Sequence, residues 1–215
     1  MSLTLYFHPL SSYCHKALIA LYENDTPFAP HYLDLQDPEV RAAFRRIWPI
    51  GKMPVLRDEA RGRTVPEASL IIEYLQEHHP GATRLLPDDP ELRFAVRERD
   101  RLFDLYVHAP MQKIVGEYLR PEGKGDPYGV EEAKATMRTA YTLLDRDMAT
   151  RTWAVGESFT LADCAAAPAL FYGDRVLPFQ DSHRHLAAYF GRLRERPSYA
   201  RALREAEPYL KFFPG

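Results

Sequence analysis

The stretch that decides the fold is the first one, Leu3-Thr4-Leu5-Tyr6-Phe7-His8-Pro9-Leu10-Ser11-Ser12-Tyr13-Cys14-His15-Lys16. An apolar, strand-like run reaches a proline-containing loop and two serines, and a helical pattern follows from Ala17 to Tyr22. The serines therefore lie where a loop turns into a helix N-terminus. Free backbone N–H groups and the positive end of the helix dipole favour an anion there. A hydroxyl at this point could hold a thiolate, an oxyanion or a phosphate.

The composition is that of an ordinary globular protein, with 215 residues, 46% hydrophobic and 27% charged. A formal net charge of -2 and the absence of a dense Lys/Arg patch argue against a nucleic-acid partner. The two cysteines, Cys14 and Cys164, suit a reducing compartment better than a disulfide scaffold. We find no secretory signal and no run near the ~18 apolar residues of a membrane span. We therefore expect a cytoplasmic protein with no membrane partner.

Residues 1–80 alternate strand and helix signals in the order β-α-β-α-β-β-α, which predicts a small mixed sheet with helices packed against it. Pro30 in the second strand indicates an edge position. The expected strands are Leu3–Phe7, Phe28–Asp34, Pro54–Arg57 and Thr64–Val65, and the expected helices are Tyr13–Asn24, Pro38–Arg46 and Ala68–His78.

A polar, proline-rich linker between His79 and Pro90 is typical of a domain boundary. Beyond it we find only helical periods, so residues 90–215 are expected to form an all-α domain. The first helix is expected to bend near Pro110. The expected helices are Glu91–Tyr118, Val130–Ala149, Leu161–Tyr172, His183–Glu195 and Tyr199–Ala206.

The run from Ser11 to Cys14 has the spacing of a redox C-x-x-C motif with serine in place of the attacking cysteine. Serine cannot carry out thiol–disulfide exchange, but it can donate a hydrogen bond to the thiolate of a ligand. That bond would lower the pKa of the ligand thiol from roughly 8.5 toward neutrality. The alternative is that Ser11 and Ser12 only cap the helix. Cys14 is expected to be a small buried residue, and His15 a surface group outside any metal cluster.

Two further signals indicate a ligand with peptide-like groups. A cis Met53-Pro54 bond ahead of a strand would leave the Met53 backbone free to pair with an extended peptide. Glu67-Ala68-Ser69 at a helix start could bind ammonium and carboxylate groups, or could be a plain cap.

One signal is structural. Thr160 and Asp163 have the spacing of a capping box, with Phe159 and Cys164 placed as its hydrophobic staple. They predict the start of a central helix.

In this order, the motifs Y-F-x-P-x-S-x-x-C, K-M-P-V-L, E-A-S-x-I-I-E-Y-L and S-F-T-L-A-D resemble the cytosolic glutathione transferases of bacterial serine type. The resemblance covers nearly the whole chain. It implies a thioredoxin-like N-terminal domain that binds glutathione as co-substrate. It also implies an all-helical C-terminal domain with a pocket for an apolar electrophile, a homodimer and no metal.

By this resemblance, Ser11 is the first candidate to activate the glutathione thiol, Ser12 the second and Tyr6 the third. Pro54 matches the cis-proline of the family, and the Met53 backbone would pair with the cysteinyl part of glutathione.

Three more residues would hold the ends of glutathione. Lys52 would approach the glycyl carboxylate, and Glu67 would meet the γ-glutamyl group. The family usually has serine directly after this glutamate, whereas this chain has Ala68 and then Ser69. The Ala68 N–H could still bind the γ-glutamyl carboxylate, and Ser69 could replace the missing hydroxyl only if the helix starts differently. The missing hydrogen bond costs roughly 1.5–3 kcal/mol, so we expect moderate affinity for glutathione.

The candidates for the electrophile pocket could equally be core residues. They are Leu10, Phe103, Tyr106, Val107 and Met111. The aromatic tail 209–213 could fold back as a lid.

The function implied is attack of the glutathione thiolate on an apolar electrophile. One alternative is a glutathione-dependent isomerase or dehalogenase, because the serine pair resembles the helix start of maleylacetoacetate isomerases. Tyr13 and Lys16 depart from that pattern. The other alternative is a non-catalytic binding or regulatory module with the same fold.

Overall fold

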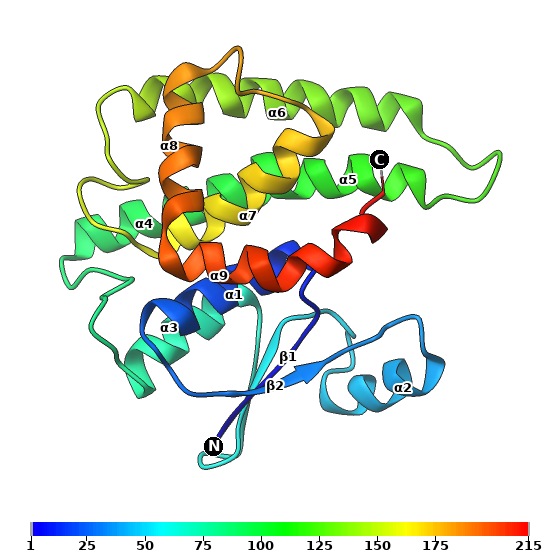
Figure 1. Cartoon of the computed structure of the whole chain (residues 1–215), viewed down its shortest axis with the longest axis vertical. Helices are drawn as coiled ribbons and strands as arrows, with labels where there is room; N and C mark the ends of the chain where they lie inside the picture. Colours follow the sequence, from blue (N-terminus) through cyan, green and yellow to red (C-terminus); the bar gives the residue numbers. More distant parts are fainter. Residues whose placement is uncertain (1, 215) are drawn as a thin grey trace. The chain divides into compact units, whose positions relative to one another are not determined.

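The computed structural model describes residues 2–214, which form two compact units (Figure 1). The first unit contains the described residues up to Leu85 together with Pro197–Leu210. The second contains Leu86–Arg196 and the described residues after Leu210. Among the described residues, no helix combines the length and the apolar character needed to cross a bilayer.

The first unit is built on a four-stranded mixed sheet in the order β2-β1-β3-β4. The strands are β1 (Leu3–Phe7), β2 (Ala29–Tyr32), β3 (Val55–Asp58) and β4 (Arg63–Pro66). β1 pairs in parallel with β2 and antiparallel with β3, and β3 pairs antiparallel with β4. β2 is an edge strand, as Pro30 predicted, because proline has no N–H for a second neighbour. The predicted small mixed sheet is therefore confirmed.

Helices cover both faces of this sheet (Figure 1). They are α1 (Ser12–Glu23), α2 (Pro38–Ile47) and α3 (Ala68–His78). α1 packs against α3, and α3 against β3 and β4. Tyr6 points to the α2 face, since its ring lies 6.1 Å from that of Phe44. Side chains alternate along a strand, so the buried Leu3, Leu5 and Phe7 face the α1 and α3 side.

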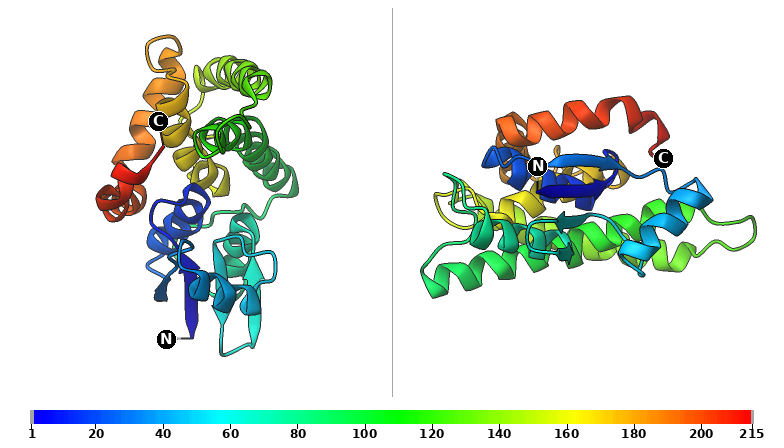
Figure 2. Two further views of the ribbon diagram at one scale, coloured as in Figure 1. Left: turned by 90° about the vertical axis from the view of Figure 1, so that its right-hand side faces the viewer. Right: turned by 90° about the horizontal axis from the view of Figure 1, so that it is seen from below.

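A C-terminal helix belongs to the first unit. α9 (Pro197–Ala206) lies alongside α1 (Figures 1 and 2). The Tyr22 hydroxyl donates to Glu205 at 2.5 Å, and Tyr199 is fully buried. We expected residues 90–215 to form one all-α domain, whereas α9 is part of the first compact unit. The reason is that these contacts join α9 to α1, which is far away in the sequence. A 3-10 turn, η2 (Glu207–Phe212), follows α9.

The second unit is entirely helical in its described residues. Its elements are α4 (Pro90–Leu102), η1 (Phe103–His108), α5 (Ala109–Tyr118), α6 (Pro127–Met148), α7 (Leu161–Val176) and α8 (Arg184–Glu195). α5 and α6 pack side by side and are seen nearly end-on in the left panel of Figure 2. A mixed sheet with helices, followed by a helical unit, confirms the predicted fold class.

The long helix expected over Glu91–Tyr118 is interrupted. Its middle turn, η1, is a π-helix, and the Ala109 N–H at its end donates to the Asp104 carbonyl five residues back. Pro110 explains the break, because it has no N–H for the Tyr106 carbonyl and its ring would clash there. The sequence therefore predicted a distortion near Pro110, but it did not predict that this distortion is a π-helical turn.

α7 is the centre of the second unit, with every residue from Leu161 to Gly173 buried. α4, η1, α5 and α8 all pack against it. Its predicted capping box is confirmed at Thr160 and Asp163. Phe159 and Cys164 are both buried, and their pairing as a staple stays a prediction.

Candidate active site

The sheet brings three predicted site segments to one edge of the first unit. Tyr6 near the end of β1 pairs with Val55 at the start of β3, and Val55 pairs with Pro66 at the end of β4. The serine loop follows β1, Met53-Pro54 precedes β3, and Glu67 follows β4. Strand register alone therefore gathers the segments that sequence analysis selected.

Ser11 is the N-cap of α1. It has extended backbone angles, its N–H donates to the His8 carbonyl at 3.0 Å, and its carbonyl accepts from the His15 N–H at 3.1 Å. Its side chain makes no capping hydrogen bond to the helix, whereas Ser12 is buried with 7% of its surface exposed. The half-buried Ser11 hydroxyl thus stands at the positive end of a 12-residue helix.

Cys14 is fully buried, as expected. Burial raises the pKa of its thiol to about 12, although hydrogen bonds from the Ser11 side chain and the backbone near His8 act in the opposite direction. The thiolate is the nucleophilic form of cysteine. Cys14 therefore does not supply a nucleophile at neutral pH.

His15 is not the surface residue that sequence analysis expected. It is fully buried, and its Nε2 lies 2.6 Å from the Pro9 carbonyl, which fixes the serine loop to α1. Burial lowers its pKa to about 4, so the ring is neutral at pH 7 and Nε2–H donates. The missed signal is that α1 is buried nearly all round, including Cys14 and every residue to Leu21. Such a helix leaves no solvent face for His15.

The Met53-Pro54 bond is cis, as predicted. Met53 is half-buried against the cluster of Leu33, Phe44 and Val55, while Lys52 is exposed. Tyr6 contributes to the same cluster, with its ring 4.6 Å from that of His31.

Glu67 has a left-handed backbone with φ of 68° and is the N-cap of α3. Its exposed side chain makes no capping bond. Such backbone strain in a residue other than glycine costs on the order of 1–3 kcal/mol and is concentrated at ligand-binding sites. α3 begins at Ala68 as predicted, which leaves its first N–H groups without helical partners.

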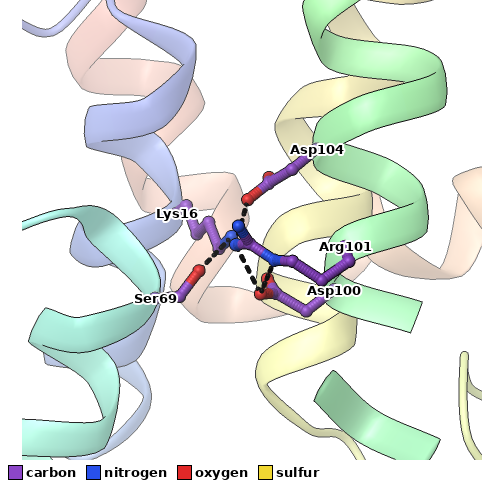
Figure 3. A network of polar contacts seen from close by, with 5 residues as sticks. All are labelled: Lys16, Ser69, Asp100, Arg101 and Asp104. Atoms are coloured by element: carbon purple, nitrogen blue, oxygen red, sulfur yellow. Dashed lines mark hydrogen bonds and ion pairs between the residues drawn. The ribbon is translucent and has the colours of Figure 1, made fainter. Parts of the chain in front are cut away.

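Ser69 faces α1 within the first unit. The fully buried Lys16 donates from Nζ to the Ser69 hydroxyl at 2.9 Å (Figure 3). Sequence analysis left open whether Ser69 replaces the hydroxyl missing at Ala68. As an acceptor from Lys16, Ser69 holds α3 to α1.

A second polar group in Figure 3 belongs to α4 and η1 in the second unit. Arg101 Nη2 lies 2.8 Å from the buried Asp100 and 2.6 Å from the buried Asp104. Because one guanidinium compensates two carboxylates, we assign this group to the stability of the helix junction. Among the described residues, no cluster of three or more His, Cys, Asp or Glu side chains could hold a metal ion.

Most candidates for the electrophile pocket are core residues of the second unit. Phe103, Val107 and Met111 are 0–2% exposed, whereas Tyr106 is 53% exposed. Leu10, in the first unit, is half-buried. The apolar residues that sequence analysis selected at helical spacing mostly form the face of η1 and α5 that packs on α7.

The aromatic tail makes one ring contact within each unit. The Tyr209 ring lies 5.0 Å from that of His8 in the first unit, next to the serine loop. In the second unit, the Phe213 ring lies 5.3 Å from that of Tyr172.

Comparison with known proteins matches residues 5–83 to the N-terminal domain of glutathione S-transferases and residues 107–197 to their C-terminal domain. The chain belongs to the glutathione S-transferase family. The two matched regions coincide with the sheet-containing segment and the helical segment described above.

Relatives within the family differ in what their names describe. A glutathione S-transferase-like protein from a Fusarium species is 32% identical over 68% of this chain and 64% of its own length. A stringent starvation protein A homologue from Coxiella burnetii is 28% identical over 99% and 97%. A probable maleylacetoacetate isomerase from Caenorhabditis elegans is 28% identical over 80% and 78%. Family membership therefore leaves the reaction open.

Two solved glutathione S-transferases are similar over nearly the full length. The enzyme from Methylobacillus flagellatus, solved with glutathione bound, is 29% identical with a TM-score of 0.85, over 94% of this chain and 98% of that one. The enzyme from Methylobacterium radiotolerans, in complex with glutathione sulfonate, is 30% identical with a TM-score of 0.82, over 93% of each chain.

Proposed function

We propose that this protein is a glutathione transferase in which the Ser11 hydroxyl donates a hydrogen bond to the glutathione thiolate. A donor at a helix N-terminus stabilises the charged form of the thiol. Lowering the thiol pKa from ~8.5 to ~6.5 would raise the thiolate at pH 7 from a few per cent to most of the pool. The thiolate would then attack carbon in an apolar electrophile.

The observation that carries this proposal is the shared edge of the sheet. Three strands that pair in register, β1, β3 and β4, carry the site features at this edge. The half-buried Ser11 comes after β1, the cis Met53-Pro54 bond comes before β3, and the left-handed Glu67 comes after β4. Cys14 has its pKa raised to about 12 by burial, so the reacting sulfur would have to come from a ligand.

We assign the parts of glutathione to this edge by the family resemblance. The Met53 backbone would pair with the cysteinyl residue, and Lys52 would approach the glycyl carboxylate. Glu67 and the Ala68 N–H would hold the γ-glutamyl ammonium and carboxylate. Ser69 would act indirectly, by fixing the start of α3 to Lys16.

The electrophile would contact Tyr106, the accessible member of the predicted pocket in the second unit. Phe103, Val107 and Met111 would support it as buried packing residues. An apolar pocket of this kind gives no substrate name.

The test compares Ser11→Ala with Ser12→Ala and Tyr6→Phe by following the thiolate absorbance of bound glutathione against pH. We expect Ser11→Ala to raise the pKa of the bound thiol from ~6.5 by one to two units, a roughly 3- to 25-fold loss of thiolate at pH 7. The other two substitutions should leave it unchanged. An unchanged thiol pKa in Ser11→Ala would rule out this role, and a rise in Ser12→Ala would transfer it to Ser12.

Two other functions have specific support. The isomerase relative and the adjacent Ser11-Ser12 pair favour glutathione-dependent isomerisation or dehalogenation of one metabolic substrate. The stringent starvation protein A homologue and the missing hydroxyl at Ala68 favour a non-catalytic module. Assays with an aryl halide, maleylacetone and small haloalkanes separate the two enzymes. A chain without activity that also fails to bind immobilised glutathione would be the module.

A further inference from the structure

The second unit has a cavity, wide open to solvent, that is lined by none of the site residues described above. It has a volume of about 280 Å³ and lies between the end of α6 and one face of α8. It is lined by Met148, Arg151, Thr152, His185, Ala188 and Arg192. The three α8 residues are spaced i, i+3 and i+7, so they share one side of that helix. The lining contains two arginines and a histidine but no carboxylate.

Arg192 is held in place by two backbone carbonyls. Its Nε and Nη2 donate to the Thr152 carbonyl at 3.2 and 3.1 Å, and Nη2 also reaches the Arg151 carbonyl at 3.5 Å. These bonds fix the guanidinium plane, and no described residue accepts a hydrogen bond from Nη1. A fixed guanidinium loses little conformational entropy when it binds an anion.

Arg151 is only weakly neutralised. Its Nη1 donates to the Ala154 carbonyl at 3.3 Å, and its nearest carboxylate, Asp147, is 4.0 Å away. Asp147 lies closer to Arg99, at 2.7 Å. The positive charge of Arg151 is therefore available to a second anion.

His185 adds a ring N–H donor. Its Nε2 accepts from Arg184 Nε at 3.0 Å. A guanidinium can only donate, so in the neutral ring the proton is on Nδ1. Together the lining residues offer two positive charges and a further N–H group.

We propose that this cavity binds the phosphoryl group of a small phosphate monoester or inorganic phosphate. Arginine pairs match the oxygen geometry of phosphate, and a doubly charged anion gains most from two guanidinium groups. The cavity is near the lower limit of ~300 Å³ for small-molecule sites, which leaves room for a short substituent against Met148 and Ala188.

The experiment measures the melting temperature of the full chain in phosphate, phenyl phosphate, sulfate and acetate at constant ionic strength. We expect phosphate and phenyl phosphate to raise it in a saturable manner and acetate to leave it unchanged. Arg151→Gln should weaken phosphate binding at least 10-fold. Arg146→Gln, which removes the same charge from an exposed residue of the same helix end, should not.

A second variant protects the test against misfolding. Ala188→Glu adds a carboxylate at an exposed position that lines the cavity, so it should also abolish the phosphate effect. A tighter response to phenyl phosphate than to phosphate would assign a monoester, and the reverse would assign the free ion. Equal responses in Arg151→Gln and Arg146→Gln, or equal stabilisation by acetate, would overturn the proposal.

Discussion

At the start of α1, three neighbouring side chains that could do chemistry are separated by burial. Burial raises the pKa of Cys14 to about 12 and lowers that of His15 to about 4, so both are neutral at pH 7. Ser11 remains half-buried at the helix N-cap. An anion held there would meet hydroxyl and N–H donors and the helix dipole, with no competing negative charge from these residues.

His15 predicts how the stability depends on pH. Between pH 6.5 and 4 the unfolded chain binds a proton at this residue and the folded chain does not. Its contribution to the free energy of unfolding is therefore complete above pH 6.5 and is lost as the pH falls, by about 3 kcal/mol in total. Urea unfolding at pH 7 and pH 4.5 should show a smaller loss in His15→Gln than in the wild type. The exposed His78 provides the control, and an equal loss in all three proteins would contradict the assignment.

Ala68 predicts a gain of affinity. If the Ala68 N–H holds the γ-glutamyl carboxylate, Ala68→Ser adds the hydroxyl that the family usually has there. One hydrogen bond to a charged group is worth about 1.5 kcal/mol, which is a roughly 10-fold tighter dissociation constant for glutathione by calorimetry. Ser69→Ala is the control, because its hydroxyl bonds Lys16, and we expect no such gain. Weaker or unchanged binding in Ala68→Ser would exclude this position for the γ-glutamyl group.

At the scale of elements, the start of α7 depends on one buried carboxylate. Asp163 accepts from the Thr160 N–H and hydroxyl at 2.8 and 3.0 Å, from the Ala154 N–H at 2.8 Å and from the Tyr189 hydroxyl at 2.7 Å. It thereby joins the preceding loop, α7 and α8. The capping box predicted from sequence contains only the Thr160 part of this network.

Asp163→Ala should therefore cost much more than the loss of an ordinary cap. The substitution leaves buried N–H and O–H donors without an acceptor. We therefore expect the free energy of unfolding to fall by roughly 3 kcal/mol or more. Asp126→Ala removes the more exposed N-cap of α6, which accepts from the Gly129 N–H at 2.9 Å, and should cost about 1 kcal/mol. Similar losses in chemical denaturation of the two variants would contradict the central role of Asp163.

Elements with local signals were predictable, and those set by distant contacts were not. Pro38 at a first turn, the start of α3 at Ala68 and the capping box all follow from a few adjacent residues. The π-helix before Pro110 depends on how a missing N–H is accommodated. The packing of α9 on α1 depends on pairs such as Ser198 and Glu23, bonded at 2.8 Å although 175 positions apart. Local patterns carry no signal for such pairs.

At the scale of the whole molecule, site features with local sequence signals were also predictable, and those set by distant contacts were not. The gathering of the serine loop, Met53-Pro54 and Glu67 at one sheet edge could be predicted, because motifs at strand ends are brought together by strand pairing. The burial of Phe103 and His15 could not, because a helical stripe or a helix start has the same appearance in a core as at a surface. The cavity beside α8 carried no sequence signal, since Arg151 and Arg192 come from segments that meet only in the folded chain.

Both units expose large apolar side chains, and the family resemblance implies a homodimer. Leu70 on α3 is 52% exposed, and Leu92 and Phe94 on α4 are 51% and 68% exposed. Leu92 and Phe94 lie on the same helix, and contiguous exposed apolar patches mark protein–protein interfaces. We infer that α4 contributes to an interface between two copies of the chain.

Phe94→Glu should then shift the protein toward monomer, because burying an unpaired carboxylate in an interface costs several kcal/mol. Light scattering after size exclusion at two concentrations would measure the shift. Tyr128→Glu makes the same chemical change at another exposed aromatic residue, 77% exposed at the start of α6, and should leave the dimer intact. A wild-type monomer at all concentrations would refute the homodimer. A dimer equally insensitive to both substitutions would place its interface away from α4.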